Sequence, residues 1–171
     1  MKHDIFNNFL RLLAVIIFST PILSCRDEVE KPYVEEYFIE VTINDAVVKF
    51  DDQASIGAIF NQYEGQYELG IYGNIGDFTG ILIHIYDGEP LGTGSYSGLA
   101  QQEGFWEGVR FSFVDDLDNY LTDPEDPTGS VEILQMNDTI VRGNFSGVLK
   151  HLTSEETINI SNGKFYVKHS N

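Results

Sequence analysis

Apolar and polar residues alternate with a period of two along most of the chain after residue 36. Residues 37–43 form the first such stretch, with apolar side chains at every second position, which is the pattern of a half-buried strand. Further stretches expected to form strands cover residues 46–50, 55–60, 67–72, 81–86, 109–113, 129–134, 140–149, 157–161 and 164–168. Since no window shows the 3.6-residue period of an amphipathic helix, residues 37–171 are predicted to form one all-β domain.

Short turn signals separate these stretches. Asn44-Asp45 and Asn137-Asp138 are expected to close hairpins, and Asn162-Gly163 is the strongest hairpin signal in the chain. Residues 81–86 carry apolar side chains on both faces, which favours a central strand. Because hairpins follow one another closely and no helix can form a crossover, we predict an antiparallel β-sandwich of about eight to ten strands, with an open or flattened β-barrel as the alternative.

Two segments of the domain look irregular. Glycines are dense in residues 88–98, where we expect turns and bulges with positive φ. Residues 115–127 are acidic and contain two prolines, so we expect them to form the longest loop, largely exposed to solvent.

The chain begins with a segment typical of an export signal. Residues 12–18 form an apolar run that is shorter than the roughly 20 residues a membrane-spanning helix needs, and Ser19-Thr20-Pro21 interrupts it. Residues 1–24 are therefore predicted to be a signal peptide.

The single cysteine, Cys25, stands directly after this segment. The stretch Ile22-Leu23-Ser24-Cys25 resembles a bacterial lipobox, which implies cleavage between Ser24 and Cys25 and lipidation of Cys25, for example with palmitate. The alternative is an ordinary secretory signal cleaved near Ser24, with Cys25 as a free thiol.

Residues 25–36 are charged and lack helical periodicity, so they are expected to form a tether behind the lipid. Two or more acyl chains give stable anchoring, so no second membrane element is required. The acidic pair Asp27-Glu28 resembles the surface-export signal of Bacteroidota-type lipoproteins. That resemblance implies a lipid-anchored protein of the outer membrane, exposed at the cell surface, whereas a plain solvated linker is the alternative.

Motifs in the domain carry a second resemblance. They are Leu91-x-x-Gly94-x-Tyr96, the segments 120–122 and 129–133, Val141-x-Gly143-x-Phe145-x-Gly147 and Ile158-x-Ile160-x-Asn162-Gly163-x-Phe165. With these motifs, most of the mature chain resembles small β-rich lipoproteins of unknown function from Bacteroidota-type bacteria. The motifs consist of turn and core residues, so the resemblance implies a fold and carries over no active site.

The chain is strongly acidic, with a formal net charge of −17. Residues 1–24 contain two basic residues and one acidic residue, so the mature chain would carry −18. Such a charge repels phosphate groups, which argues against nucleic acid as a partner.

Candidate binding residues are few. Phe105 and Trp106, flanked by glycines, could stack on a sugar ring, and the alternative is packing within a hairpin. Asp115, Asp116 and Asp118 offer clustered oxygens for calcium, although the spacing of an EF-hand is missing, and a solvated acidic loop is the alternative. Asp138-Thr139-Ile140 resembles the acceptor for O-glycosylation in Bacteroidota-type bacteria, which would make Thr139 a modified residue.

No catalytic constellation is evident in the sequence. The three histidines outside the signal segment, His84, His151 and His169, are not at metal-ligand spacing, so we predict no metal and no cofactor. We expect a membrane-anchored exported lipoprotein that acts as a non-enzymatic binding or structural module, with a glycan or protein partner. One alternative is a carrier that holds a small apolar ligand inside a barrel, and another is a glycan-binding surface lipoprotein.

Overall fold

The domain is built from β-strands. The computed structural model describes residues 36–63 and 65–170, which belong to a unit spanning residues 35–171. Within the described residues there are twelve strands and no helix. The strands are β1 (Phe38–Ile43), β2 (Ala46–Phe50), β3 (Ile56–Tyr63), β4 (Gln66–Ile75), β5 (Thr79–Asp87), β6 (Gly94–Ser97), β7 (Leu99–Gln102), β8 (Phe105–Asp115), β9 (Asp118–Leu121), β10 (Ser130–Met136), β11 (Ile140–His151) and β12 (Thr157–Ser170).

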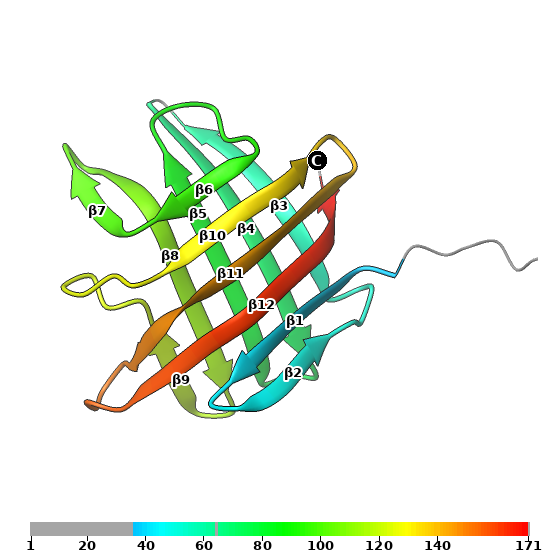
Figure 1. Cartoon of the computed structure of the whole chain (residues 1–171), viewed down its shortest axis with the longest axis vertical. Helices are drawn as coiled ribbons and strands as arrows, with labels where there is room; N and C mark the ends of the chain where they lie inside the picture. Colours follow the sequence, from blue (N-terminus) through cyan, green and yellow to red (C-terminus); the bar gives the residue numbers. More distant parts are fainter. Residues whose placement is uncertain (1–35, 64, 171) are drawn as a thin grey trace, which may run out of the picture. The chain divides into compact units, whose positions relative to one another are not determined.

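The strands form two layers. They pair in the order β2–β1–β12–β3–β4–β5–β8–β9–β11–β10–β6, β7 pairs with β8, and an additional β11–β12 pairing closes a ring of strands. Figure 1 shows β6, β10, β11, β12, β1 and β2 in a front layer that crosses β3, β4, β5 and β8 behind it. The predicted all-β fold is confirmed, and its form is that of a β-sandwich or flattened barrel.

The two layers join at two corners. On one side the last residues of β12 pair in parallel with β3, at His169–Ala58 and Ser170–Ile59. On the other side the short β9 links β8 to β11. All the other pairings between described strands are antiparallel, as predicted.

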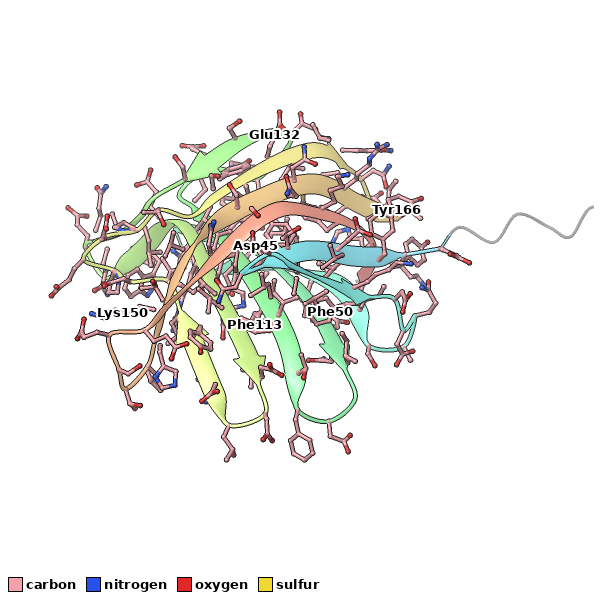
Figure 2. The ribbon with its side chains drawn as sticks, turned by 60° about the horizontal axis from the view of Figure 1, so that its bottom comes forward. Asp45, Phe50, Phe113, Glu132, Lys150 and Tyr166 are labelled. Carbon is pink, nitrogen blue, oxygen red and sulfur yellow. The ribbon has the colours of Figure 1, made fainter. Side chains whose placement is uncertain are left out.

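Aromatic rings fill the space between the layers. The ring centroid of Phe145 lies 5.9 Å from that of Phe111 and 6.3 Å from that of Phe165. Figure 2 shows Phe50 and Phe113 on the inner side and Glu132 on the outer side of the layers, in agreement with their burial. The described core is thus close-packed by side chains from both layers.

The hairpin predicted at Asn162-Gly163 is wrong. Residues 157–170 form the single strand β12, and Asn162 adopts a φ of 52° within it. The pairings of β12 with β1 and with β11 both shift register at this point. The Asn-Gly pair therefore forms a bulge, because β12 is paired on both sides and continuing those ladders outweighs the local turn preference.

The acidic segment 115–127 is not one continuous loop, because β9 lies inside it. In the same way, β6 and β7 form within or directly after the glycine-rich passage, so the strands number more than the eight to ten expected. Short strands of about four residues carry too little alternation to be recognised from the sequence. The turn at Asn44-Asp45 and the central position of the strand at 81–86 are confirmed.

Candidate ligand-binding face

The outer face of β3, β4, β5 and β8 carries the clearest candidate site. Antiparallel register places Tyr72 of β4 beside Leu82 of β5, and Leu82 beside Ser112 of β8. Their neighbours along each strand, Ile71, Ile81 and Phe111, point into the core. The alternation of the three strands thus presents one aromatic, one aliphatic and one hydroxyl side chain in a row on the outer surface.

A groove of about 650 Å³ lies over this row. We call it the Tyr72 groove, and its lining consists of Ser55, Tyr72, Asn74, Gly76, Asp77, Phe78, Thr79, Gly80, Ile81, Leu82, Ser112, Val114 and Asp116. The volume falls within the range of about 300 to 1,000 Å³ that is usual for small-ligand sites. The groove is therefore large enough for a small molecule or part of a chain-like ligand.

Two glycines shape the floor of the groove. A Cβ on Gly57 would lie 2.7 Å from Tyr72 Oη, and a Cβ on Gly80 would lie 2.5 Å from Asn74 Oδ1. Because these atoms are absent, the side chains of Tyr72 and Asn74 can lie across the neighbouring strands.

Hydrogen bonds between loops hold the rim of the groove. The backbone N–H of Asn74 donates to the backbone oxygen of Ser55 at 3.1 Å, and the backbone N–H of Asp116 donates to that of Phe78 at 3.1 Å. Thr79 Oγ1 donates to Asp115 Oδ1 at 3.0 Å. The β4–β5 and β8–β9 turns are therefore fastened together, and they lie at the same end of the domain in Figure 2.

A polar cluster adjoins the groove on the same face. His84 Nδ1 lies 2.5 Å from Tyr86 Oη and 3.1 Å from Glu68 Oε1. His84 is also the cross-strand neighbour of Arg110. We call Glu68, His84, Tyr86 and Arg110 the His84 cluster.

The His84 cluster is sheltered enough to shift proton affinities. Burial lowers the pKa of His84, partly opposed by the nearby Glu68 carboxylate, and Arg110 lowers it further. Burial also raises the pKa of Tyr86, again with a contribution from Glu68 in the same direction. The imidazole and the phenol are therefore both neutral near pH 7, and the cluster acts as a fixed hydrogen-bonded network.

Neither the groove nor the cluster was predicted from the sequence, where His84 was considered only as a possible metal ligand. Glu68 and Arg110 belong to different strands, 16 and 26 positions from His84, and only the sheet register brings them together. The available signal was the polar positions 84 and 86 alternating within an otherwise apolar strand, which indicates an outer face but no partners.

The predicted stacking pair lies elsewhere, at the β7–β8 hairpin. Phe105 is 44% exposed, and its ring lies beside the β3–β4 turn, 3.6 Å from where a Cβ on Gly65 would be. The Gln66 side chain donates to the backbone oxygen of Trp106. These contacts favour a packing role for the hairpin, and glycan stacking by Phe105 and Trp106 stays a prediction.

The three aspartates considered as calcium ligands have different surroundings. Asp115 accepts a hydrogen bond from Thr79, Asp116 lines the Tyr72 groove, and Asp118 Oδ1 lies 3.6 Å from His151 Nε2. In the part of the chain that the structure describes, no group of three or more His, Cys, Asp and Glu residues is arranged to hold a metal ion.

Of the two candidate modification sites, Thr139 belongs to the described residues and Cys25 does not. Thr139 is exposed in the β10–β11 turn, where its amide donates to Asn137 Oδ1 at 2.9 Å and its carbonyl accepts from the His169 amide at 2.8 Å. Its O-glycosylation stays a prediction. Cys25, Ser24, the signal peptide and most of the tether lie outside the described residues.

A second groove of about 620 Å³ lies on the outer face of the front layer. In its lining, Ser130 Oγ lies 3.2 Å from Ser146 Oγ, and Asn144 Nδ2 donates to Glu132 Oε2 at 3.2 Å. The side chains of Ser95, Ser97, Asn162 and Lys164 have no hydrogen-bond partner among the described residues. The side chains of Asn74, Asp77 and Ser112 in the Tyr72 groove likewise have no hydrogen-bond partner among the described residues. The Tyr72 groove differs in that its lining also includes the ring of Phe78, which is 65% exposed. The Tyr72 groove is therefore the better candidate for binding a ligand.

Comparisons of the chain with protein-family models, with curated proteins and with solved structures found no match. Among the residues that the structure describes there is no apolar helix long enough to cross a membrane.

Proposed function

We propose that the chain is an exported lipoprotein of the outer membrane, held by lipid on Cys25, whose β domain is a non-enzymatic binding module. The lipobox-like stretch Ile22–Cys25 and the charged tether support the anchoring. In this arrangement the tether holds the β domain above the lipid surface, where its outer faces can meet a partner.

The observation that supports a binding role is that the core is filled by side chains, whereas the Tyr72 groove on the outer face is open to solvent. Leu69, Ile83 and Phe111 are fully buried between the layers. Added Cβ atoms on Gly129 and Gly163 would already lie 2.7 Å from core phenylalanine rings. A core packed to this density favours recognition at the surface over carriage of an apolar ligand inside a barrel.

Charge narrows the class of partner. The predicted mature chain carries about −18, which disfavours nucleic acids and other polyanions. Neutral or basic partners suit this surface, whether glycan or protein.

Metabolic labelling with a palmitate analogue tests the anchor. The wild-type protein should incorporate the label and fractionate with the outer membrane. The Cys25→Ser variant should incorporate none and appear as unprocessed or soluble protein, because the thiol that accepts lipid is missing. Circular dichroism of both proteins controls for folding, and equal incorporation in the two would overturn the proposal.

A further inference from the structure

The Tyr72 groove combines the half-buried ring of Tyr72 and the exposed ring of Phe78 with three polar side chains that have no hydrogen-bond partner among the described residues. We propose that this groove binds a neutral saccharide, with Tyr72 and Phe78 packed against a sugar ring and Asn74, Asp77 and Ser112 bound to its hydroxyl groups. This inference rests on the proposed binding function and names its ligand class and its site.

The apolar half of the site comes from Tyr72 and Phe78. Phe78 is 65% exposed at the tip of the β4–β5 turn, so its ring is accessible to a ligand. The axial C–H faces of a pyranose ring are flat and apolar, so they can remove such rings from water. Leu82 and Val114 add two apolar side chains to the lining.

The polar half of the site can match sugar hydroxyls. Asn74 offers a donor and an acceptor, Asp77 offers acceptors, and Ser112 offers both. A hydroxyl group is itself a donor and an acceptor, so neighbouring hydroxyls on a ring can satisfy this set together. None of the three side chains has to give up a bond to another described residue, so binding replaces only bonds to water.

The rim is already in place before a ligand arrives. The hydrogen bonds Asn74–Ser55, Asp116–Phe78 and Thr79–Asp115 fix the loops on both sides of the groove. A site ordered in advance loses little conformational entropy on binding, which matters for weakly bound ligands such as sugars.

Other ligand classes fit less well. An extended peptide commonly binds by adding a strand, but β5 is paired with β4 and β8 along its whole length, so no backbone edge is free under the groove. Anionic ligands, including fatty acids and uronic acid polymers, would meet Asp77 and Asp116 and the acidic domain around them.

The test is a binding screen with the full-length protein in a polyoxyethylene detergent, which carries no sugar headgroup. The probes are neutral hexasaccharides of glucose, mannose, xylose and N-acetylglucosamine, with oligogalacturonate, deacetylated chitohexaose and laurate as charged or apolar comparisons. We expect at least one neutral probe to bind in isothermal titration calorimetry and the anionic probes not to bind.

Variants of the rings locate the site. Tyr72→Ala and Phe78→Ala should each weaken binding of that neutral probe about tenfold or more, whereas Tyr72→Phe should keep most of it because the ring remains. Tyr63→Ala is the matched control, since Tyr63 is exposed on β3 outside the groove lining, and it should change affinity less than about twofold. Phe78 is at an exposed turn, so Phe78→Ala keeps the test valid if Tyr72→Ala fails to fold.

Four results would overturn the inference: no neutral probe binds, only a charged or apolar probe binds, binding is unaffected in folded Phe78→Ala, or binding is lost in Phe105→Ala or Trp106→Ala instead. Palmitate labelling is measured separately on the same protein. A labelled protein that binds no neutral saccharide would reject the ligand class alone, whereas an unlabelled protein would reject the anchor.

Discussion

Glycines serve opposite purposes in the two layers. In the front layer, Gly163 of β12 faces inward, and its missing Cβ leaves room for the backbone and ring of Phe145. In the back layer, Gly57 lies beneath the side chain of Tyr72 on the outer face. One glycine makes space for the core, whereas the other makes space for a surface groove.

The atoms that an added Cβ would meet at Gly163 and at Gly57 differ in how easily they can move away. At Gly163 the nearest atom to an added Cβ would be the backbone oxygen of Phe145, at 2.6 Å, and a paired strand cannot move away from it. At Gly57 the nearest atom would be the hydroxyl oxygen of Tyr72, at 2.7 Å, which is the far end of a flexible side chain. The same substitution should therefore test the fold in one layer and the groove in the other.

The largest effect is expected for Gly163→Ala. The added methyl group must displace Phe145 and the β11–β12 ladder, so the free energy of unfolding should fall by about 2 kcal/mol, as for other overpacked cores. Urea unfolding followed by circular dichroism measures this change. Gly88→Ala is the control, because nothing lies within 4 Å of its added Cβ and it should be close to neutral.

A smaller stability effect is expected for Gly57→Ala. The Tyr72 side chain can rotate away from the new methyl group, so the cost should stay below about 1 kcal/mol. Its ring should nevertheless leave its position over β3, and the affinity for a ligand in the Tyr72 groove should fall. Nuclear magnetic resonance shifts of the Tyr72 ring report the movement, and a cost equal to that of Gly163→Ala would show that the outer contact is as rigid as the core contact.

The smallest effect is expected from the His84 cluster, and only in acid. Because burial lowers the folded-state pKa of His84 below its ordinary value of 6.5, the unfolded chain binds the proton first. The neutral His84 side chain therefore contributes its full stabilisation of the folded state above about pH 6.5. This contribution is lost as the pH falls through the folded-state pKa. In His84→Gln, unfolding free energies measured between about pH 7 and pH 5 should show a shallower decline than in the wild type.

The charged groups around His84 act on its pKa in opposite directions. Glu68 favours the protonated imidazole, whereas Arg110 opposes it, and Tyr86 stays neutral over this range. A wild-type histidine that titrates above 6.5 by nuclear magnetic resonance would contradict the dominant role of burial.

Much of the fold could be predicted from local patterns, and one failure shows their limit. The Asn44-Asp45 hairpin forms because the two residues adopt positive φ values of 46° and 69° between adjacent strands. Asn162-Gly163 carries a stronger hairpin signal but becomes a bulge, since β12 has partners on both sides that hold it extended. Local turn preference decides the outcome only where no neighbouring ladder competes with it.

The candidate site was predicted less well than the fold. Phe105 and Trp106 stand out in the sequence because two large aromatic residues are adjacent between glycines. Tyr72 and Phe78 do not stand out, because each is a single aromatic residue in a strand or turn. Their importance depends on Gly57, 15 positions before Tyr72, and on Asp116, 38 positions after Phe78.

The sequence by itself determined where the longer strands lie and which of their side chains share a face, because the period of two is a local property of an extended backbone. It also determined the strong negative charge and the lipobox-like stretch. Only the tertiary structure decided which strands pair and in which register, since those choices depend on the burial of segments that are distant in the chain. The Tyr72 groove and the His84 cluster follow from that register.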